Sequence, residues 1–159
     1  MKDLTTPAAV STGEDDFDFQ TWPFYWLTRA NGSYLQKMEL ALKTIDIDIP
    51  RWRVLMVLHK TGCSSVSEIA DHAIMKLPTM TKIVRRMQAD GLVVCRQRDT
   101  DARVTEVILS EAGKVAGAKA WAIAGRTYRR AFSQMTARQI ATLNRLLAQV
   151  CDNLGPAGE

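Results

Sequence analysis

Apolar residues recur at helical spacing along most of the chain, and this pattern defines the expected elements. A first helix is expected to have Thr21 as its N-cap and Pro23 in its first turn, with an apolar stripe over residues 35–45 at spacings of three and four. A second helix is expected to begin near Pro50 and to end before Gly62. Both segments are long enough for their apolar faces to pack in a core.

Two shorter helices are expected next. Ser65 and Glu68 have the spacing of a capping box, so a short helix should start at Ser65 and continue to about Ala73. Another helix should run from near Pro78 to about Asp90, where a glycine follows. Together these two helices have the lengths of a helix-turn-helix pair.

A β-hairpin and two longer helices complete the pattern. Residues 93–98 and 103–109 are rich in β-branched residues and flank the polar stretch 99–102, which predicts two antiparallel strands. Ser110 is the expected cap of a fifth helix that runs to about Met135. A second capping box at 136–139 precedes a sixth helix, whose apolar seam extends from Ile140 to Leu154. The predicted fold is mainly α with a small β-hairpin wing, a winged helix-turn-helix lobe joined to a helical dimerisation region.

Composition divides the chain into four expected segments. Residues 1–20 carry one lysine against five acidic residues and little periodicity, which predicts a disordered acidic tail. The remainder should comprise a dimerisation helix over 21–49, the DNA-binding lobe over 50–109 and dimerisation helices over 110–159. No apolar run is long enough to cross a bilayer and no leader pattern is evident, so a soluble cytoplasmic protein that does not bind membranes is expected.

Cysteine and histidine usage argues against metal and cofactor chemistry. The three cysteines form no CxxC pair and only two histidines are present, so no metal site or cofactor is expected. His59 and His72 have no nucleophile and acid spaced as a triad, so no catalytic residues and no enzyme activity are expected. An oxidation-sensing role for Cys63 or Cys95 stays open, although free cysteines are more often small buried hydrophobes.

The distribution of charge favours a polyanionic partner. Residues 50–103 contain ten Lys or Arg against five Asp or Glu. On a helical wheel the predicted fourth helix has an apolar face, with cations and hydroxyls opposite, as a helix in the DNA major groove requires. Thr81 and Lys82 are candidates for base edges, and Arg85 and Arg86 for phosphates. The full DNA-binding set that we predict is Pro78, Thr79, Thr81, Lys82, Arg85, Arg86, Arg98, Asp101 and Arg103.

The hairpin strengthens this prediction because arginines surround its turn. Arg96, Arg98 and Arg103 are expected to concentrate at a protruding tip, where guanidinium groups suit the negative potential of a narrow minor groove. Asp101 is expected to orient Arg103 by a bidentate pair.

These motifs together resemble the DNA-binding core of MarR-type regulators. The similarity rests on residues 81–87, Gly91-Leu92-Val93, the wing signature around Asp101-Ala102-Arg103, and Leu109-Ser110-Glu111-Ala112-Gly113, within a stretch from about Trp22 to Leu154. The resemblance implies a homodimer on a pseudo-palindromic double-stranded operator, with Arg103 in the minor groove and Asp101 positioning it. Leu77 and Pro78 depart from the family, since many relatives have a small polar residue there.

Aromatic residues suggest a site for an effector. Trp22, Tyr25, Trp26, Arg29, Trp52 and Arg53 would suit a small aromatic carboxylate or phenol, because rings supply stacking area and arginine binds the acid group. Dimer core is the other interpretation of the same rings.

The sequence therefore predicts a homodimeric, sequence-specific transcriptional repressor that is released from its operator by such a ligand. The alternatives are a winged-helix module for protein interaction, without specific DNA binding, and a redox-responsive regulator that uses a cysteine.

Overall fold

The computed structural model describes residues 18–155. The expected acidic tail, residues 1–20, therefore lies outside the described residues as far as position 17. The chain divides into two compact units, residues 1–37 and 38–159, and each is described by itself. Among the described residues no helix has the length and apolar character needed to cross a membrane.

In the first unit a short 3-10 turn, Phe19–Thr21, precedes helix α1, Pro23–Leu42. The predicted N-cap role of Thr21 is wrong, since its hydroxyl donates to the carbonyl of Asp18 at 2.8 Å. Thr21 closes the turn, and Asp18 caps that turn by accepting from the backbone N–H of Gln20. The last three residues of the segment that we expected to be disordered, 18–20, thus take part in this turn.

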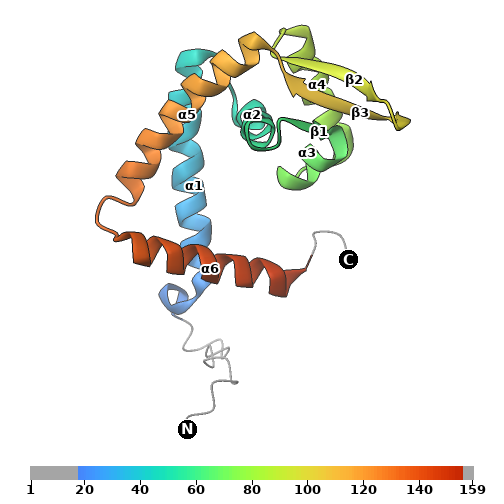
Figure 1. The fold of residues 1–159 in the computed structure, drawn as a ribbon. Coiled ribbons are helices and arrows are strands. Elements are labelled where there is room, and N and C mark those ends of the chain that lie inside the picture. Colours follow the sequence, from blue (N-terminus) through green and yellow to red (C-terminus); the bar gives the residue numbers. More distant parts are fainter. Residues whose placement is uncertain (1–17, 156–159) are drawn as a thin grey trace. The chain divides into compact units, whose positions relative to one another are not determined.

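The second unit contains the end of α1, a 3-10 turn and five further helices (Figure 1). The α-helical part of α1 ends at Leu42, and a 3-10 turn continues to Ile45, the last residue of the predicted stripe. The fifth helix also ends earlier than the predicted Met135. The helices after the turn are α2 Ile49–Thr61, α3 Val66–His72, α4 Leu77–Ala89, α5 Glu111–Ala131 and α6 Ala137–Leu154.

The sheet has three antiparallel strands in the order β1-β3-β2. Strands β2, Val93–Arg98, and β3, Asp101–Leu109, form the predicted hairpin, although β3 begins two residues earlier than expected. The sequence did not predict β1, Cys63–Ser65, because three residues are too few to display alternation. Cys63, the first residue of β1, pairs with Ile108 of β3.

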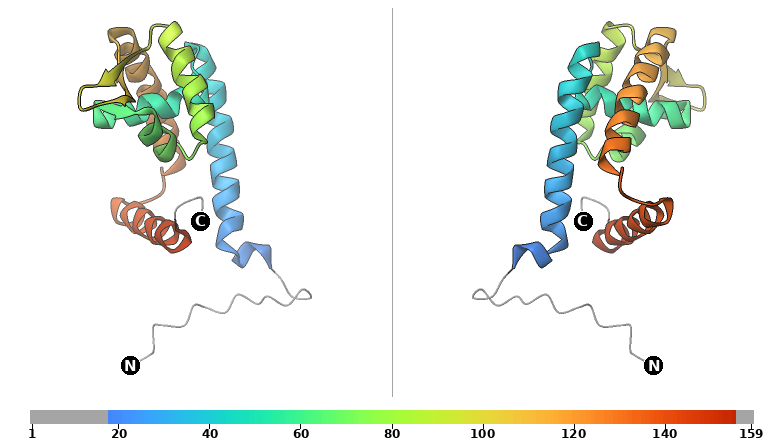
Figure 2. Two further views of the ribbon diagram at one scale, coloured as in Figure 1. Left: turned by 90° about the vertical axis from the view of Figure 1, so that its right-hand side faces the viewer. Right: turned by 90° about the vertical axis from the view of Figure 1, so that its left-hand side faces the viewer.

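The core of the second unit lies where α2, α4 and the sheet pack together (Figure 2). Trp52, Leu55 and Leu58 contribute from α2, and α4 contributes three buried side chains, Met80, Val84 and Met87. Each large side chain buried in this way stabilises the fold by roughly 1.5–3 kcal/mol. Met56, on the same helix α2, is 37% exposed.

The start of α5 is joined to the turn that follows α4. The Ser110 hydroxyl donates to the carbonyl of Gly91 at 2.6 Å and its backbone N–H donates to the carbonyl of Leu92 at 3.1 Å. Ser110 also caps α5, as predicted, by accepting from Gly113 at 3.0 Å. Gly113 is buried there, and a Cβ at this position would overlap the carbonyl oxygen of Leu92.

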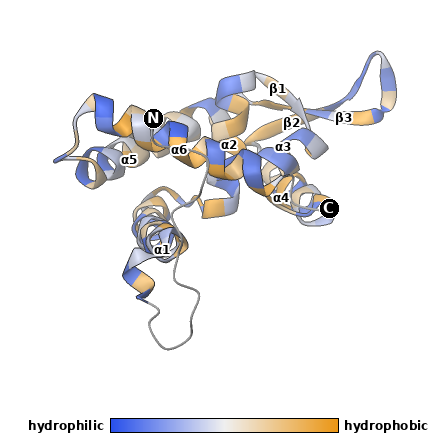
Figure 3. Cartoon of the chain, turned by 90° about the horizontal axis from the view of Figure 1, so that it is seen from below, coloured by the Kyte–Doolittle hydropathy of each residue, from blue (hydrophilic) through white to orange (hydrophobic). Residues whose placement is uncertain are grey.

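Helix α6 carries its apolar residues on one side, and none of its residues is buried in the second unit. Its coloured ribbon alternates between hydrophobic and hydrophilic segments (Figure 3). The predicted capping box at its start is confirmed, since Thr136 and Gln139 exchange side-chain and backbone hydrogen bonds.

Candidate nucleic-acid interface

Helix α4 has the two faces that the sequence predicted. Met80, Val84 and Met87 are buried, whereas Lys82 and Arg85 are exposed on the other side. The residue before the helix is Lys76, which makes no side-chain cap bond, and Leu77 is the first helical residue. Proline at the second helical position costs nothing, because its missing N–H would have no helical partner. Pro78, Thr79 and Arg86 are also exposed.

Thr81 is partly buried and its hydroxyl donates to the carbonyl of Leu77 at 2.9 Å. The hydroxyl proton is therefore used inside the helix, and the oxygen keeps acceptor capacity. At a base edge Thr81 would then accept a hydrogen bond or contact a thymine methyl group.

A hollow of about 140 Å³ lies between the beginning of α2 and α4, lined by Asp48, Arg51, Thr79, Lys82, Ile83 and Arg86. Arg51 has a structural role, because it donates to the carbonyl of Asp46 at 3.1 Å and lies 3.6 Å from the carboxylate of Asp90. Lys82 and Arg86 make no ion pair within residues 18–155, so their charges remain available to an anion.

At the end of the hairpin, Arg103 Nε lies 3.2 Å from Asp101 Oδ1, and the backbone N–H of Arg103 donates to the same oxygen at 3.0 Å. The pair is therefore not bidentate as predicted, since one carboxylate oxygen accepts both bonds. The Arg103 side chain is 92% exposed, which leaves its terminal nitrogens open to a ligand. Figure 3 shows this end of the hairpin as mainly hydrophilic.

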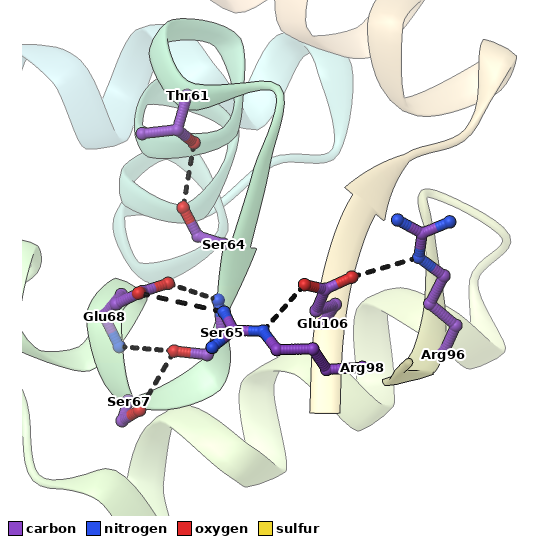
Figure 4. Close-up of polar contacts among 8 residues, drawn as sticks. All are labelled: Thr61, Ser64, Ser65, Ser67, Glu68, Arg96, Arg98 and Glu106. Atoms are coloured by element: carbon purple, nitrogen blue, oxygen red, sulfur yellow. Dashed lines mark hydrogen bonds and ion pairs between the residues drawn. The ribbon is translucent and has the colours of Figure 1, made fainter. Parts of the chain in front are cut away.

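The side chains of the other two arginines are directed away from the tip, although Arg98 is the last residue of β2 and pairs with Asp101. Arg98 Nε donates to Glu106 Oε1 at 2.9 Å, and Arg96 Nε donates to Glu106 Oε2 at 3.1 Å (Figure 4). Arg98 also lies 3.9 Å from Glu68, the carboxylate of the α3 capping box. The prediction that three arginines concentrate at the tip is wrong for Arg96 and for the Arg98 side chain, because Glu106 binds both of them along the hairpin.

This group of four charges, Glu68, Arg96, Arg98 and Glu106, is ionised at neutral pH. Hydrogen bonds from Arg98 and then Arg96 lower the pKa of Glu106, and Glu106 in turn raises the pKa of both arginines. The backbone N–H of Ser65 lowers the pKa of Glu68. Sequence reasoning missed Glu106 because its pairing opposite Arg96 depends on the strand register.

The predicted effector residues fall into two groups. In the first unit, Tyr25 and Trp26 meet edge to face with ring centroids 5.0 Å apart, and Arg29 lies 5.5 Å from the Tyr25 centroid. Trp22 packs edge-on against Phe24 with centroids 5.8 Å apart. These residues contact one another within one helical segment and its preceding turn.

Trp52 and Arg53 belong to the second unit, where packing engages them. Trp52 is only 3% exposed and meets Trp121 edge to face at 5.1 Å between centroids. Arg53 donates to the carbonyl of Ala73 at 3.0 Å, which joins α2 to the end of α3. These contacts favour a structural role for both side chains over direct ligand contact.

A groove of about 580 Å³ lies one to two helical turns beyond Trp52 and Arg53 on α2, and sequence reasoning missed it. Its apolar wall includes Met56 and Trp121, and two histidines and a lysine border it. The spacing of Trp52, Met56 and His59, four and three residues, was the available sequence signal. The lining residues are Met56, Val57, His59, Lys60, Thr61, His72 and Trp121.

The three cysteines differ in their surroundings. Burial raises the pKa of Cys95, which disfavours its thiolate. Cys63 is partly buried and Cys151 is exposed. No group of three or more metal-binding side chains occurs among the described residues.

A helix pair with a cationic outer face, followed by a hairpin whose end carries an exposed arginine, defines a winged helix-turn-helix DNA-binding protein. The MarR family profile matches residues 47–105. The chain is 46% identical over 140 residues to the HTH-type transcriptional repressor IacR of Pseudomonas putida. These residues make up 88% of this chain and 84% of the relative. The chain belongs to the MarR family of transcriptional regulators, which bind DNA and are not enzymes.

Solved structures support the fold. A mutant MarR of E. coli in complex with operator DNA matches with a TM-score of 0.70 and 21% identity, over 79% of this chain and 90% of that one. BpsR of Bordetella bronchiseptica, whose DNA binding is regulated by 6-hydroxynicotinic acid, matches with a TM-score of 0.70 and 16% identity, over 80% and 96% of the two chains.

Proposed function

We propose that this protein is a homodimeric repressor that binds a pseudo-palindromic operator and leaves it on binding a small aromatic acid or phenol. The division of α4 into a buried apolar face and an exposed face with Lys82 and Arg85 carries the DNA-binding part of the proposal. In it, α4 enters the major groove, and residues 50–109 act as the DNA-binding lobe. Residues 21–49 and 110–159 provide the dimerisation helices.

Base edges and phosphates have separate partners in this proposal. Thr81 and Lys82 meet base edges, and Arg85 and Arg86 meet phosphates. Arg103 enters the minor groove, where Asp101 limits the freedom of its side chain.

The apolar seam of α6 supports the homodimer. Ile140, Leu143, Leu147 and Val150 are only partly buried in the second unit, and Leu154 is 67% exposed. An apolar stripe at alternating spacings of three and four is the pattern of helices that pack between subunits. A two-fold axis would then place two α4 helices about 34 Å apart on successive major grooves.

The groove beside Trp121 is the better candidate for the effector site. Its volume lies in the range of small-molecule sites, roughly 300–1,000 Å³. Trp121 and Met56 offer an apolar wall, and Lys60 offers a cation for an acid group. The regulation of BpsR by 6-hydroxynicotinic acid supports an aromatic acid as the class of ligand.

Operator binding is tested with the full chain and a labelled duplex from its own upstream DNA, by fluorescence anisotropy against salt concentration. Lys82→Ala and Arg103→Ala should each weaken binding by about 1–3 kcal/mol, roughly 5- to 150-fold. Lys119→Ala is the matched control, since this exposed lysine lies on α5, away from α4 and the hairpin. An equal loss in all three variants would remove the assigned contacts from the proposal.

The effector site is tested by adding aromatic acids and phenols, 6-hydroxynicotinic acid among them, to the operator complex. Lys60→Gln removes a cation from the groove beside Trp121, and Arg29→Gln removes the cation that lies over Tyr25. If the added compound still releases Arg29→Gln from the operator but no longer releases Lys60→Gln, the groove is supported as the effector site. The opposite pattern supports a site at the residues around Tyr25. Equal release in wild type and both variants contradicts both locations.

A further inference from the structure

Glu106 is the centre of the group of four charges on the outer face of the sheet. It lies opposite Arg96 in the β2–β3 register, and the neighbouring Val107 is fully buried on the inner face. Its side chain is only 14% exposed, because the two arginines cover it. Each of its oxygens accepts from one arginine, so a single carboxylate engages both guanidinium groups.

Both arginines bond to Glu106 through Nε, so their terminal nitrogens make no hydrogen bond to Glu106, and Nη2 of Arg98 lies 3.9 Å from Glu68 instead. In Figure 4 the terminal nitrogens of Arg96 point away from Glu106, and this side chain is 59% exposed. Arg98 is 35% exposed, and Glu68 lies on its other side. Two cations on the surface of the wing are therefore balanced by two carboxylates.

This balance matters because phosphate attraction carries no sequence information. Sequence-independent binding to DNA depends almost entirely on the number of cations that neutralise phosphates, whereas specific binding adds contacts to base edges. Glu106 makes no hydrogen bond or ion pair to α4 within the described part of the chain. It can therefore alter the phosphate attraction of the wing without altering the face that meets base edges.

A lobe that slides on non-operator DNA settles wherever its cations and the phosphates match best. On the operator, base contacts fix the register, and an arginine gains a phosphate only where that register places one. Release of Arg96 and Arg98 would thus benefit non-operator binding more than operator binding.

We propose that Glu106 is a specificity-determining residue that restrains Arg96 and Arg98 and so limits sequence-independent binding of the wing to the DNA backbone. The proposal rests on the proposed function, in which α4 and the wing contact the operator. Glu106 acts through the two arginines and does not itself contact DNA.

The test compares wild type with Glu106→Gln, which keeps the shape of the side chain and removes its charge. Affinities for an operator duplex and for a scrambled duplex of equal length are measured by anisotropy over a range of salt. The variant should bind the scrambled duplex about three- to tenfold more tightly at low salt, with a slope of log K against log salt steeper by about one to two. The operator affinity should rise less, so the ratio of the two affinities falls.

Two further variants separate charge from folding. Glu106→Asp keeps the charge and should stay nearer to wild type in both salt slopes. Adding Arg96→Gln and Arg98→Gln to Glu106→Gln should abolish the gain on the scrambled duplex. Circular dichroism of each variant confirms that the fold is retained.

Two results would overturn the proposal: unchanged or weaker binding of Glu106→Gln to the scrambled duplex, or an equal gain on both duplexes. Weaker binding would mean that Glu106 presents the arginines to phosphate. Failure of the proposed function is a different result, in which wild type does not prefer the operator and Lys82→Ala changes nothing.

Discussion

Gly113 allows the backbone of α5 to lie directly against the carbonyl of Leu92. A Cβ would overlap that oxygen, and a backbone oxygen in a hydrogen-bonded turn has little room to shift. We expect Gly113→Ala to lower the free energy of unfolding by about 1–3 kcal/mol, as overpacking typically does. Urea denaturation measures the change.

Gly117 is the control for this substitution, because it lies on the same helix and a Cβ there meets no atom within 4 Å. Gly117→Ala should stabilise the protein by up to about 1 kcal/mol through helix propensity. A stable Gly113→Ala variant would show that the turn before β2 can move.

Glu106 also predicts a dependence of stability on pH. Its folded pKa lies below the ordinary value of about 4.5, so its contribution is complete above that pH and is lost as the pH falls through the folded pKa. The difference in unfolding free energy between wild type and Glu106→Gln should therefore be constant from pH 6 to 8, because this range lies about 1.5 or more pH units above the ordinary carboxyl pKa of 4.5. The difference should shrink in acid. Urea denaturation across this range and below pH 4.5 checks it; a difference that grows in acid would contradict the assigned ion pairs.

Contacts between residues that are close in the sequence could be predicted, whereas contacts that depend on strand register or on distant elements could not. The contact between Asp101 and Arg103 was predictable because the two residues are neighbours on one strand. The contact between Glu106 and Arg98 was not, since it depends on a register shift next to Arg98. The engagement of Arg53 with Ala73 likewise joins residues twenty positions apart.

Among the elements, helix α3 depends on its capping box. The Ser65 hydroxyl accepts from the Glu68 N–H at 3.2 Å, and Glu68 accepts from the Ser65 N–H at 2.7 Å. Ser65→Ala should cost about 0.5–2 kcal/mol of stability. Thermal and urea denaturation measure this loss.

Ser67→Ala provides a comparison in the same turn, since Ser67 contacts the Ser65 hydroxyl at 3.0 Å but caps no backbone group. Its effect should be within about 0.5 kcal/mol. An equal loss in both variants would mean that the cap is not the source of the stability.

Helix starts were the best predicted features of the elements because their signals are local. The caps at Ser65, Ser110 and Thr136 are confirmed, each by a side chain and a backbone group within three residues. Thr21 is not the cap because it belongs to the preceding 3-10 turn and lies two residues before Pro23, the first residue of α1. Strand β1 is defined only by its pairing with β3, which no local pattern encodes.

At the scale of the whole molecule, the α6 seam predicts the oligomeric state. Leu147→Asp places a charge in the middle of the seam and should convert a dimer into monomers, because a buried unpaired carboxylate is costly at an interface. Light scattering after size exclusion gives the mass, and operator affinity should fall with it. Arg145→Ala, on the exposed side of the same helix, should keep the mass of the wild type.

A dimeric Leu147→Asp variant would remove α6 from the proposed interface. A wild type that is already monomeric would contradict the homodimer itself.

The junction of Ser110 and Gly113 with Gly91 and Leu92 bears on how an effector signal could travel. Two hydrogen bonds and a close backbone contact join the first turn of α5 to the residues directly after α4. The start of α5 is therefore bonded to the short turn through which the chain leaves α4. In the proposed dimer, an effector that displaced the first turn of α5 would pull on this turn, and the spacing of the two α4 helices would change with it.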